Sequence, residues 1–371
     1  MASTFSERLF SMDYPDLVAF VSKVVRKGFE GFLQLEAEDF TPDLREATEA
    51  YLLRGGKCLR PMLLMLSAMA AGERHLEKLF STAMLAIECY HTATLVHDDI
   101  IDHDELRRGQ PTVHTLVARR IARRDPRLGT AKATDYGMAT AIVAGDVLFG
   151  YSAQLFGLLS SHYPLGVVNS ILLEQSCELH PGLLLGEQLD MELEMMDLQD
   201  VTPKMVEMMM RLKTGLLLSF AARVGAALGS RKTIDKCPLA EMLGEAAEKA
   251  GIAFQIQDDI LGLFGSEAQL GKPIGSDLRE GKPTLLMVKA WEKATVAERK
   301  RLKKILGNPA INDKDIADAR TVVERTGALM ACQNRATRLV KEAEKTFQSI
   351  SDDLVRNHLI AWLNSLVKRK N

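Results

Sequence analysis

Two aspartate pairs, at positions 98–99 and 258–259, interrupt apolar stretches that otherwise repeat with the period of an α-helix. The first lies in the segment LVHDDIID (95–102) and the second in FQIQDDIL (254–261). Unpaired carboxylates are costly to bury among apolar side chains. The fold therefore has to supply each pair with a partner, which constrains it more than any other feature of the chain.

A divalent cation suits the first pair well. Asp98 and Asp102 are four residues apart, so we expect them on one helix face, about one turn apart. Mg²⁺ takes oxygen ligands and shares them with substrate phosphates. A single such motif also fits a solvated helix turn or an N-cap cluster. Here two copies with apolar flanks, each followed by phosphate-binding cations, predict several Mg²⁺ ions holding one polyphosphate between facing helices.

Helical periodicity dominates the remaining sequence, and alternating strand patterns are nearly absent. We predict helices at about 15–35, 43–54, 59–71, 75–104, 111–123, 134–160, 166–196, 203–228, 238–264, 283–293, 296–306, 313–324, 327–349 and 351–369. Several of these are apolar on most sides, which is typical of the centre of a bundle. We therefore predict one all-α domain over 1–371, with a motif-bearing core at about 40–295 and C-terminal helices at about 296–371.

Composition indicates a soluble cytoplasmic enzyme. The chain has 371 residues, 47% of them hydrophobic and 26% charged, as in ordinary globular proteins. A net charge of −2 gives no reason to expect nucleic acid or an acidic membrane as partner. Five scattered cysteines without CxxC spacing favour reduced thiols. Residues 1–13 lack the apolar core of a signal peptide, and the apolar stretch at about 138–159 is expected to be a buried core helix rather than a membrane span.

Cationic clusters accompany the carboxylates. In GGKCLRP (55–61), Lys57 and Arg60 follow two glycines, which allow the backbone to approach an anion closely. Arg107 and Arg108 follow the first aspartate motif. Further cations occur at Lys213-Thr214 and in the Gly-Lys-Pro sequences that contain Lys272 and Lys282.

Taken together, GGKCLRP, HTATLVHDDIIDHDELRRGQPTVH, Lys213-Thr214 and FQIQDDILG…GKPIGSDLREGKPT resemble the trans-isoprenyl diphosphate synthases, or polyprenyl synthetases. The resemblance runs in order from about residue 50 to 290. It implies an all-α bundle of the isoprenoid synthase type around a central active-site cavity. It also implies a Mg²⁺-dependent prenyltransferase (EC 2.5.1 type) that joins isopentenyl diphosphate head-to-tail to allylic diphosphates.

The resemblance also implies residue roles. Asp98 and Asp102 would hold two Mg²⁺ ions and Asp258 a third, about three per active site, with Asp99 and Asp259 as hydrogen-bonding partners. The allylic diphosphate would contact Arg107, Lys213 and Lys272. The diphosphate of isopentenyl diphosphate, which needs no metal, would contact Gly56, Lys57, Arg60, His91 and Arg108. Lys282 is a further substrate-binding candidate, and Thr214 and Gln255 would present dipoles to a carbocation.

Two positions depart from the pattern or leave its meaning open. Gly262 stands where many members of the family carry a third aspartate, although some members, archaeal ones among them, share the DDILG form. Asp190, in the sequence GEQLD, resembles the Gln-Asp helix of the family. Either a supporting role at the site or a buried structural role fits Asp190.

Product length is expected to depend on residues upstream of Asp98. Ala93, five residues before it, is small, whereas family members that stop at three isoprene units often carry an aromatic residue there. Tyr90 lies three residues deeper, about 4.5 Å along a helix, or roughly one isoprene unit. We predict that Tyr90 closes the tunnel and that the product is geranylgeranyl diphosphate or one unit longer. Core packing is the alternative role of Tyr90.

The sequence is also compatible with three other functions. The chain could be a longer-chain polyprenyl diphosphate synthase. A class I terpene cyclase would share a lone DDxxD motif but would have no use for Lys57 and Arg60. A non-catalytic subunit of a heteromeric synthase would be expected to have eroded aspartate motifs, whereas the first motif is intact. The resemblance favours the catalytic prenyl synthase, paired as a homodimer.

Overall fold

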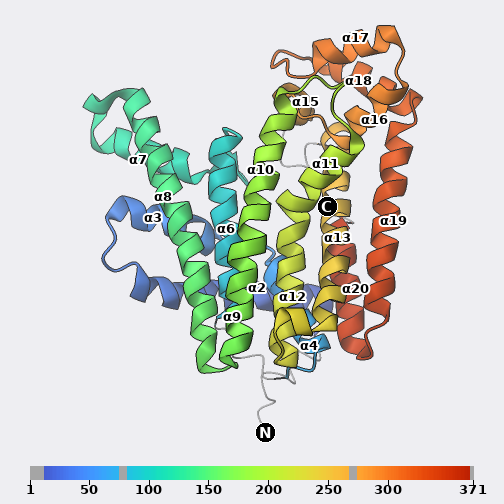
Figure 1. Cartoon of the computed structure of the whole chain (residues 1–371). Coiled ribbons are helices and arrows are strands. Elements are labelled where there is room, and N and C mark those ends of the chain that lie inside the picture. Colours follow the sequence, from blue (N-terminus) through green and yellow to red (C-terminus); the bar gives the residue numbers. More distant parts are fainter. Residues whose placement is uncertain (1–11, 75–81, 267–273, 368–371) are drawn as a thin grey trace. The chain divides into compact units, whose positions relative to one another are not determined.

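The computed structural model describes residues 12–74, 82–266 and 274–367 (Figure 1). Helices make up nearly all of its regular structure. Within the described ranges the one β-element is a hairpin of β1 (Leu106–Arg107) and β2 (Gln110–Pro111). The all-α prediction is therefore confirmed. Backbone contacts divide the chain into two units: unit 1 comprises Met1–Gln175 and Ala221–Glu241, and unit 2 comprises Ser176–Phe220 and Met242–Asn371. The assignment of 1–371 to one domain stays a prediction.

Unit 1 contains the described helices before residue 175 and one short helix of its second segment, Ala221–Glu241. They are α2 (Tyr14–Glu36), α3 (Pro42–Arg54), α4 (Leu59–Ala70), α6 (Ala83–Ile101), α7 (Val113–Arg124), η1 (Pro126–Leu128), α8 (Gly129–Leu158), η2 (Leu159–Ser161), α9 (Leu165–Glu174) and η5 (Ile234–Lys236). Three elements cross a boundary between the units: η3 (Gln175–Leu179), α12 (Leu216–Ser230) and α13 (Pro238–Phe264).

Unit 2 contains the remaining helices. They are α10 (His180–Met195), α11 (Pro203–Met210), η4 (Arg211–Gly215), α15 (Ser276–Glu280), α16 (Leu285–Lys293), α17 (Val296–Ile305), α18 (Asp313–Arg325), α19 (Ala328–Gln348) and α20 (Asp353–Val367). Of these, α19 and α20 lie side by side (Figure 1).

The predicted helices agree closely with these bounds, and α13 agrees at both ends. The helix predicted at 75–104 is different, because α6 begins only at Ala83; residues 75–81 lie outside the described part of the chain. The helix predicted at 166–196 corresponds to α9 and α10, which are joined by the short π-helix η3. The hairpin and the short α15 had no counterpart in the sequence prediction.

In unit 1, α6 packs along α8, and α7 and α3 pack on other parts of α8 (Figure 1). The buried residues of α6 are mainly apolar, Ile87, Tyr90 and Ala93 among them, but they also include Thr92 and Asp99. The prediction that the apolar stretch of α8 is a buried core helix was only half right. Ile142 and Val143 on its other side are 47% and 49% exposed.

Two helical stretches are long and apolar enough to span a membrane, judged by length and composition alone: Pro126–Ser161 and Pro203–Ser230. The most apolar window of the second is 78% buried inside the protein, as expected of a core helix, whereas that of the first is 44% buried. The core helices of soluble proteins meet the same criterion, so these two stretches are weak grounds for a membrane assignment.

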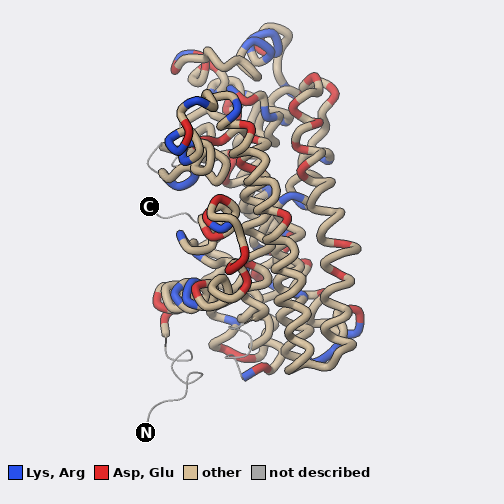
Figure 2. The backbone as a smooth tube through the Cα atoms, turned by 90° about the vertical axis from the view of Figure 1, so that its left-hand side faces the viewer, with Lys and Arg blue, Asp and Glu red and all other residues tan. Residues whose placement is uncertain are grey.

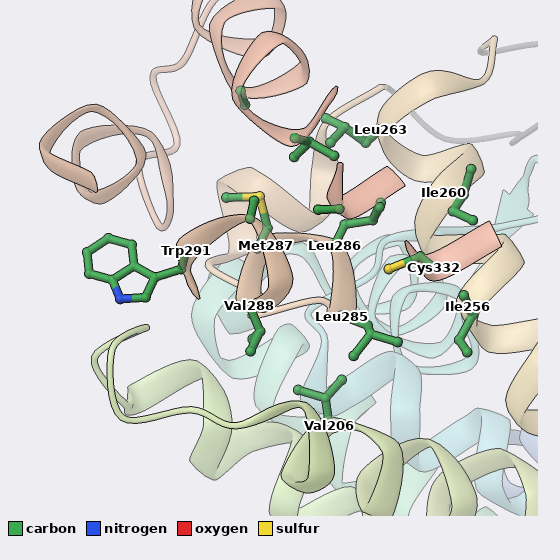
Figure 3. Packing of buried hydrophobic residues seen from close by; sticks show 14 of the residues in the cluster. Val206, Ile256, Ile260, Leu263, Leu285, Leu286, Met287, Val288, Trp291 and Cys332 are labelled. Carbon is green, nitrogen blue, oxygen red and sulfur yellow. The ribbon is translucent and has the colours of Figure 1, made fainter. Parts of the chain in front are cut away.

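The core of unit 2 forms where α11, α13, α16 and α19 meet (Figure 3). Val206, Ile256, Leu285 and Cys332 contribute from these four helices and are all buried. Figure 2 shows long uncharged stretches along the helices, with many charged residues toward their ends. Charged residues within an apolar helical segment, such as the two aspartate pairs, are therefore unusual in this chain.

Candidate active site

The C-terminal end of α6 places the first aspartate motif. The helix ends at Ile101, and Asp102 caps it with near-helical backbone angles. The backbone N–H of Asp102 donates a 2.8 Å hydrogen bond to the carbonyl of Asp98, so the two residues are one turn apart as expected. The Asp98 side chain is 19% exposed. Two carboxylates at a helix end, one of them partly open to solvent, are thus available to a cation.

Asp99, between them, is 1% exposed and engaged by two side chains. Arg107 donates from Nε to its Oδ1 at 2.7 Å, and the Tyr51 hydroxyl donates to its Oδ2. A second nitrogen of Arg107 lies 3.1 Å from Oδ2 of Asp98. Burial raises the pKa of Asp99, whereas Arg107 and Tyr51 oppose that rise. Sequence reasoning missed Tyr51, since a tyrosine four residues before Gly55 carries no signal of this contact.

The hairpin presents Arg107 and Arg108. Its two turn residues, Arg108 and Gly109, have φ of 52° and 73°, as in a type I′ turn. Arg108 Nη1 donates a 2.8 Å hydrogen bond to the carbonyl of Gly55. A Cβ atom on Gly56 would lie 3.0 Å from the same nitrogen. The two glycines of GGKCLRP thus allow the guanidinium to lie directly against the backbone.

A cavity of about 360 Å³ lies in unit 1 beside these groups. Its lining residues are Ser22, Val25, Arg26, Phe29, Tyr51, Leu52, Arg54, Gly55, Cys58, Glu88, His91, Thr92, Leu95, Arg107, Arg108 and Gln110. Cationic groups of the hairpin and apolar side chains of α2, α3 and α6 share its wall. Such a pocket suits a small molecule with an anionic head and an apolar tail.

His91 lines this cavity, and Arg60 lies next to His91. Nη1 of Arg60 is 2.9 Å from Nε2 of His91. Burial lowers the pKa of His91 well below its ordinary value, and the charges of Arg60, Arg107 and Arg108 lower it further. His91 is therefore a neutral imidazole at neutral pH. Lys57 is exposed in the adjoining turn.

The second aspartate motif lies on α13 in unit 2. Asp259 is 9% exposed, and the backbone N–H of Leu285 donates a hydrogen bond to it. Burial raises its pKa well above the ordinary range, and Asp277, Asp258 and Asp190 reinforce the rise. The second aspartate is therefore the buried one in this motif too, as Asp99 is in the first.

Asp277 explains the departure at Gly262. A Cβ atom on Gly262 would lie 2.8 Å from Oδ2 of Asp277, which comes from α15. The backbone N–H of Gly275 donates a 3.1 Å hydrogen bond to the Gly262 carbonyl and holds that segment in place. A carboxylate from another helix thus fills the space that a side chain at 262 would need.

Lys213, Thr214 and Gln255 come together in unit 2. The Lys213 ammonium lies 2.7 Å from Oδ2 of Asp190 and 3.0 Å from Oε1 of Glu187. The Thr214 hydroxyl donates a 3.2 Å hydrogen bond to Oε1 of Gln255. Asp190 is thereby a direct partner of Lys213, and Glu187 is a partner that the sequence did not indicate.

Of the two Gly-Lys-Pro lysines, Lys282 lies within the described residues. The Lys282 ammonium lies 3.4 Å from Oε2 of Glu280 and 3.9 Å from Oε1 of Glu194, so it has acidic neighbours. Lys272 lies outside the described residues.

Close helix packing positions Lys213. It lies in the short π-helix η4, and π-helical segments of this kind are often found at functional sites. A Cβ atom on Gly186 of α10 would lie only 2.5 Å from the backbone nitrogen of Lys213, and one on Gly251 of α13 only 2.7 Å from Cα of Gly215. Glycines at these points let three backbones approach and bring the lysine within reach of Asp190.

We expect Gly186→Ala to separate α10 from η4, because its new methyl group would meet backbone atoms that cannot move aside. The free energy of unfolding should fall by about 1–3 kcal/mol, measured by urea denaturation. Gly31→Ala is the control, since nothing lies within 4 Å of its Cβ position in α2. It should be neutral or stabilising by up to about 1 kcal/mol. Equal stability of the two variants would contradict the packing argument.

The donor set fits Mg²⁺. In residues 12–74, 82–266 and 274–367, no three His, Cys, Asp or Glu side chains converge into a ready metal cage. Mg²⁺ commonly binds through one or two carboxylates and completes its shell with water and substrate phosphates. Asp98 and Asp102 on one helix face offer oxygen ligands of that kind.

In unit 1, α6 carries paired carboxylates beside an arginine-lined cavity, an arrangement that fits the metal-dependent enzymes that act on diphosphate esters. Comparison with known proteins gives the family. The polyprenyl synthetase family model matches residues 41–325. The chain therefore belongs to the polyprenyl synthetase family and is a trans-isoprenyl diphosphate synthase by membership.

Relatives and solved structures agree with this assignment. The chain is 35% identical to a geranylfarnesyl diphosphate synthase of Aeropyrum pernix, over 82% of this chain and 86% of that one. It is 31% identical to a geranylgeranyl pyrophosphate synthase of Geoglobus acetivorans, over 94% and 97%. The structure of geranylgeranyl pyrophosphate synthetase from Pyrococcus horikoshii superposes with a TM-score of 0.80 at 31% identity, covering 96% and 99%. That of geranylgeranyl pyrophosphate synthase from Corynebacterium glutamicum, complexed with isoprenyl diphosphate and magnesium, gives 0.83 at 25% identity, covering 97% and 100%.

Proposed function

We propose that this chain condenses isopentenyl diphosphate head-to-tail with allylic diphosphates in a Mg²⁺-dependent reaction, and that its product is geranylgeranyl diphosphate or one isoprene unit longer. One observation carries the proposal: unit 1 holds a carboxylate pair suited to a metal and, beside it, a cavity lined by cationic groups. A terpene cyclase binds one diphosphate and needs only the former. Two different anion sites fit an enzyme with two diphosphate substrates.

The cavity would bind isopentenyl diphosphate. Arg108, Arg60 and His91 would contact its diphosphate, with Lys57 and the Gly56 backbone at the entrance. Arg108 is already placed by its hydrogen bond to the carbonyl of Gly55. The apolar wall from Val25, Phe29 and Leu95 suits the five-carbon tail. These contacts require no metal ion.

Asp98 and Asp102 would hold two Mg²⁺ ions and Asp258 a third. Bound metal would neutralise charge that develops on the allylic diphosphate as its C–O bond breaks. Asp99, held by Tyr51, would fix Arg107 for the same diphosphate. Lys213 would add a further cation, aligned by Asp190 and Glu187.

The same residues account for the course of the reaction. The double bond of isopentenyl diphosphate attacks the allylic cation, and the proton then lost passes to the departing diphosphate. Thr214 and Gln255 share a hydrogen bond, so their dipoles are fixed where they could stabilise the cation without reacting with it. Apolar walls would exclude water that would otherwise capture the cation.

Tyr90 is our candidate for the floor of the tunnel. Its ring is 1% exposed and packs edge-on against Phe149 of α8, with ring centroids 4.9 Å apart. Ala93, three residues nearer Asp98, is small and fully buried. These contacts support a chain that stops at Tyr90.

We expect Tyr90→Ala to lengthen the main product by at least one isoprene unit, because the floor loses its ring. Products would be dephosphorylated and sized by chromatography against linear standards. Tyr136→Ala, on the same unit but 40% exposed, is the control and should leave the length unchanged. An unchanged product from Tyr90→Ala would leave core packing as the role of this residue.

A homodimer in the cytoplasm is the assembly that we propose. Two helices of unit 1 that contact each other carry exposed apolar side chains: Ile142, Val143 and Leu158 on α8, and Leu165 and Leu173 on α9. An apolar surface of this kind is typical of an interface between protein copies. Light scattering of the purified protein would measure the mass of the assembly.

The function is tested by incubating the purified protein with Mg²⁺, labelled isopentenyl diphosphate and, separately, dimethylallyl, geranyl and farnesyl diphosphates. We expect linear products only when metal and both substrates are present. Cyclic or hydrolysed products from the allylic substrate alone would indicate a cyclase. No turnover with any primer would indicate a non-catalytic subunit.

A further inference from the structure

Glu88 is an acidic residue in a cavity that otherwise suits an anion. It lies on α6, three residues before His91, and both line the same cavity. Its Oε2 atom is buried and has no hydrogen-bond partner among the described residues. A buried carboxylate oxygen without a donor is costly, and natural structures contain few such groups. This one therefore calls for a functional explanation.

The neighbouring groups lack partners in the same way. Within the described residues, Nε of Arg60 and Nδ1 of His91 are likewise buried without one. The guanidinium of Arg60 can only donate, so the nitrogen of His91 that faces it, Nε2, accepts. The neutral ring consequently carries its proton on Nδ1. Two unused donors indicate a ligand with acceptor oxygens, as a diphosphate has.

Glu88 does not fit that ligand in its ionised form. A carboxylate only accepts hydrogen bonds and repels a diphosphate, whereas a protonated carboxyl group can donate one.

The charges around Glu88 decide its protonation state. Burial raises the pKa of Glu88, whereas the guanidinium groups of Arg60 and Arg108 lower it. The titratable and charged groups on the elements around it are Cys89 and His91 of α6, Cys58 and Arg60 at the start of α4, Arg107 and Arg108 of the hairpin, Arg26 of α2, and Tyr51 and Arg54 of α3. A bound diphosphate would offset the two arginines that favour the anion, while burial of the carboxyl remains.

We propose that Glu88 takes up one proton from solvent when isopentenyl diphosphate binds, and that the resulting carboxyl group donates a hydrogen bond to the bound ligand. The proton returns to solvent when the ligand leaves. This inference rests on the proposed function of the cavity as the isopentenyl diphosphate site. It makes Glu88 a residue that couples substrate affinity to pH.

The sign of the effect follows from linkage. Between the pKa of Glu88 in the free enzyme and its higher pKa in the complex, the complex binds more protons than the free enzyme. Affinity for isopentenyl diphosphate therefore falls as pH rises through that interval, by up to about tenfold per pH unit. Glu88→Gln replaces the protonated carboxyl with a neutral group of similar shape that can also donate.

The test is calorimetric titration of the protein with isopentenyl diphosphate alone, without Mg²⁺ or allylic substrate, so that no turnover occurs. Titrations in buffers of different ionisation enthalpy give the protons taken up per ligand, and a pH series gives the slope of Kd. The diphosphate has its own titration, which the wild-type protein and the variant share. We expect Glu88→Gln to bind well and to take up close to one proton fewer than the wild type. Glu241→Gln, at an exposed position in α13, is the control and should match the wild type.

Difference infrared spectra of the wild-type protein provide a test that needs no folded variant. Binding should produce the C=O band of a protonated carboxyl group. Equal proton uptake by wild type and Glu88→Gln, or the absence of that band, would overturn the role of Glu88 while leaving the cavity assignment intact. Weak binding by Glu88→Gln with an unchanged pH slope would also overturn it, in favour of an ionised positioning residue. Failure of the wild-type protein to bind isopentenyl diphosphate at all would overturn the proposed function as well.

Discussion

Asp98→Asn is expected to lower kcat at least about a thousandfold, because it removes the charge of a carboxylate that we propose binds metal on the leaving-group side of the reaction. The effect should be on turnover rather than on folding. Arg107 would keep its hydrogen bond to Asp99, which lies in the core. Steady-state kinetics over a range of Mg²⁺ concentrations would measure the loss, and thermal unfolding without Mg²⁺ would verify the fold.

The matched control is Asp39→Asn, which changes an exposed aspartate of the same unit. It should leave both kcat and the dependence on Mg²⁺ unchanged. Binding of isopentenyl diphosphate to Asp98→Asn should also be unchanged, because the cavity is proposed to bind it without metal. Turnover by Asp98→Asn close to that of the wild type would contradict the metal-binding role of this carboxylate.

Arg107→Met should give the second large effect, this time on stability as well as activity. It would leave Asp99, 1% exposed, with the Tyr51 hydroxyl as its remaining side-chain partner. Removal of one partner from a buried ion pair costs about 3–5 kcal/mol. The free energy of unfolding, from urea denaturation followed by circular dichroism, should fall by about that amount. Activity should fall too, since Arg107 is proposed to bind the allylic diphosphate.

A double variant separates the two effects. Asp99→Asn combined with Arg107→Met has no unpaired buried charge and should recover most of the lost stability but little activity. Arg107→Lys keeps the charge but loses the forked geometry that reaches both Asp98 and Asp99, so it should be intermediate in both. If the double variant were as unstable as Arg107→Met, the ion pair would not be the source of the stability.

The sequence predicted best those features that follow from a locally repeating pattern. Most of the helices, though not the short α15, follow from apolar periodicity, and the spacing of Asp98 and Asp102 follows from the helical repeat. Contacts between segments that are far apart in the chain produce no repeating pattern in the sequence. The bond from Tyr51 to Asp99 spans 48 positions, and Asp277 reaches the space beside Gly262 from another helix.

The half-exposed α8 shows a second limit of sequence patterns. Its composition is that of a buried helix, but composition does not say whether the chain itself or a second copy covers a given face. The hairpin escaped prediction for a different reason. Two-residue strands are too short to show an alternation of apolar and polar residues. The only local indication of the hairpin was the Arg108-Gly109 sequence at its turn.

That turn has a consequence for how the loop can change over time. In the hairpin, Leu106 is opposite Pro111 and Arg107 opposite Gln110, joined by two turn residues. Neighbouring positions in a strand face opposite sides, so a slip of one residue exchanges the sides. Insertion or deletion of a single residue here would send the side chain that holds Asp99 away from it and disturb the contact of Arg108 with Gly55. Most surface loops tolerate changes in length. The register of this loop places two arginines that make different contacts. We therefore expect related sequences to keep its length constant even where the residues around it differ.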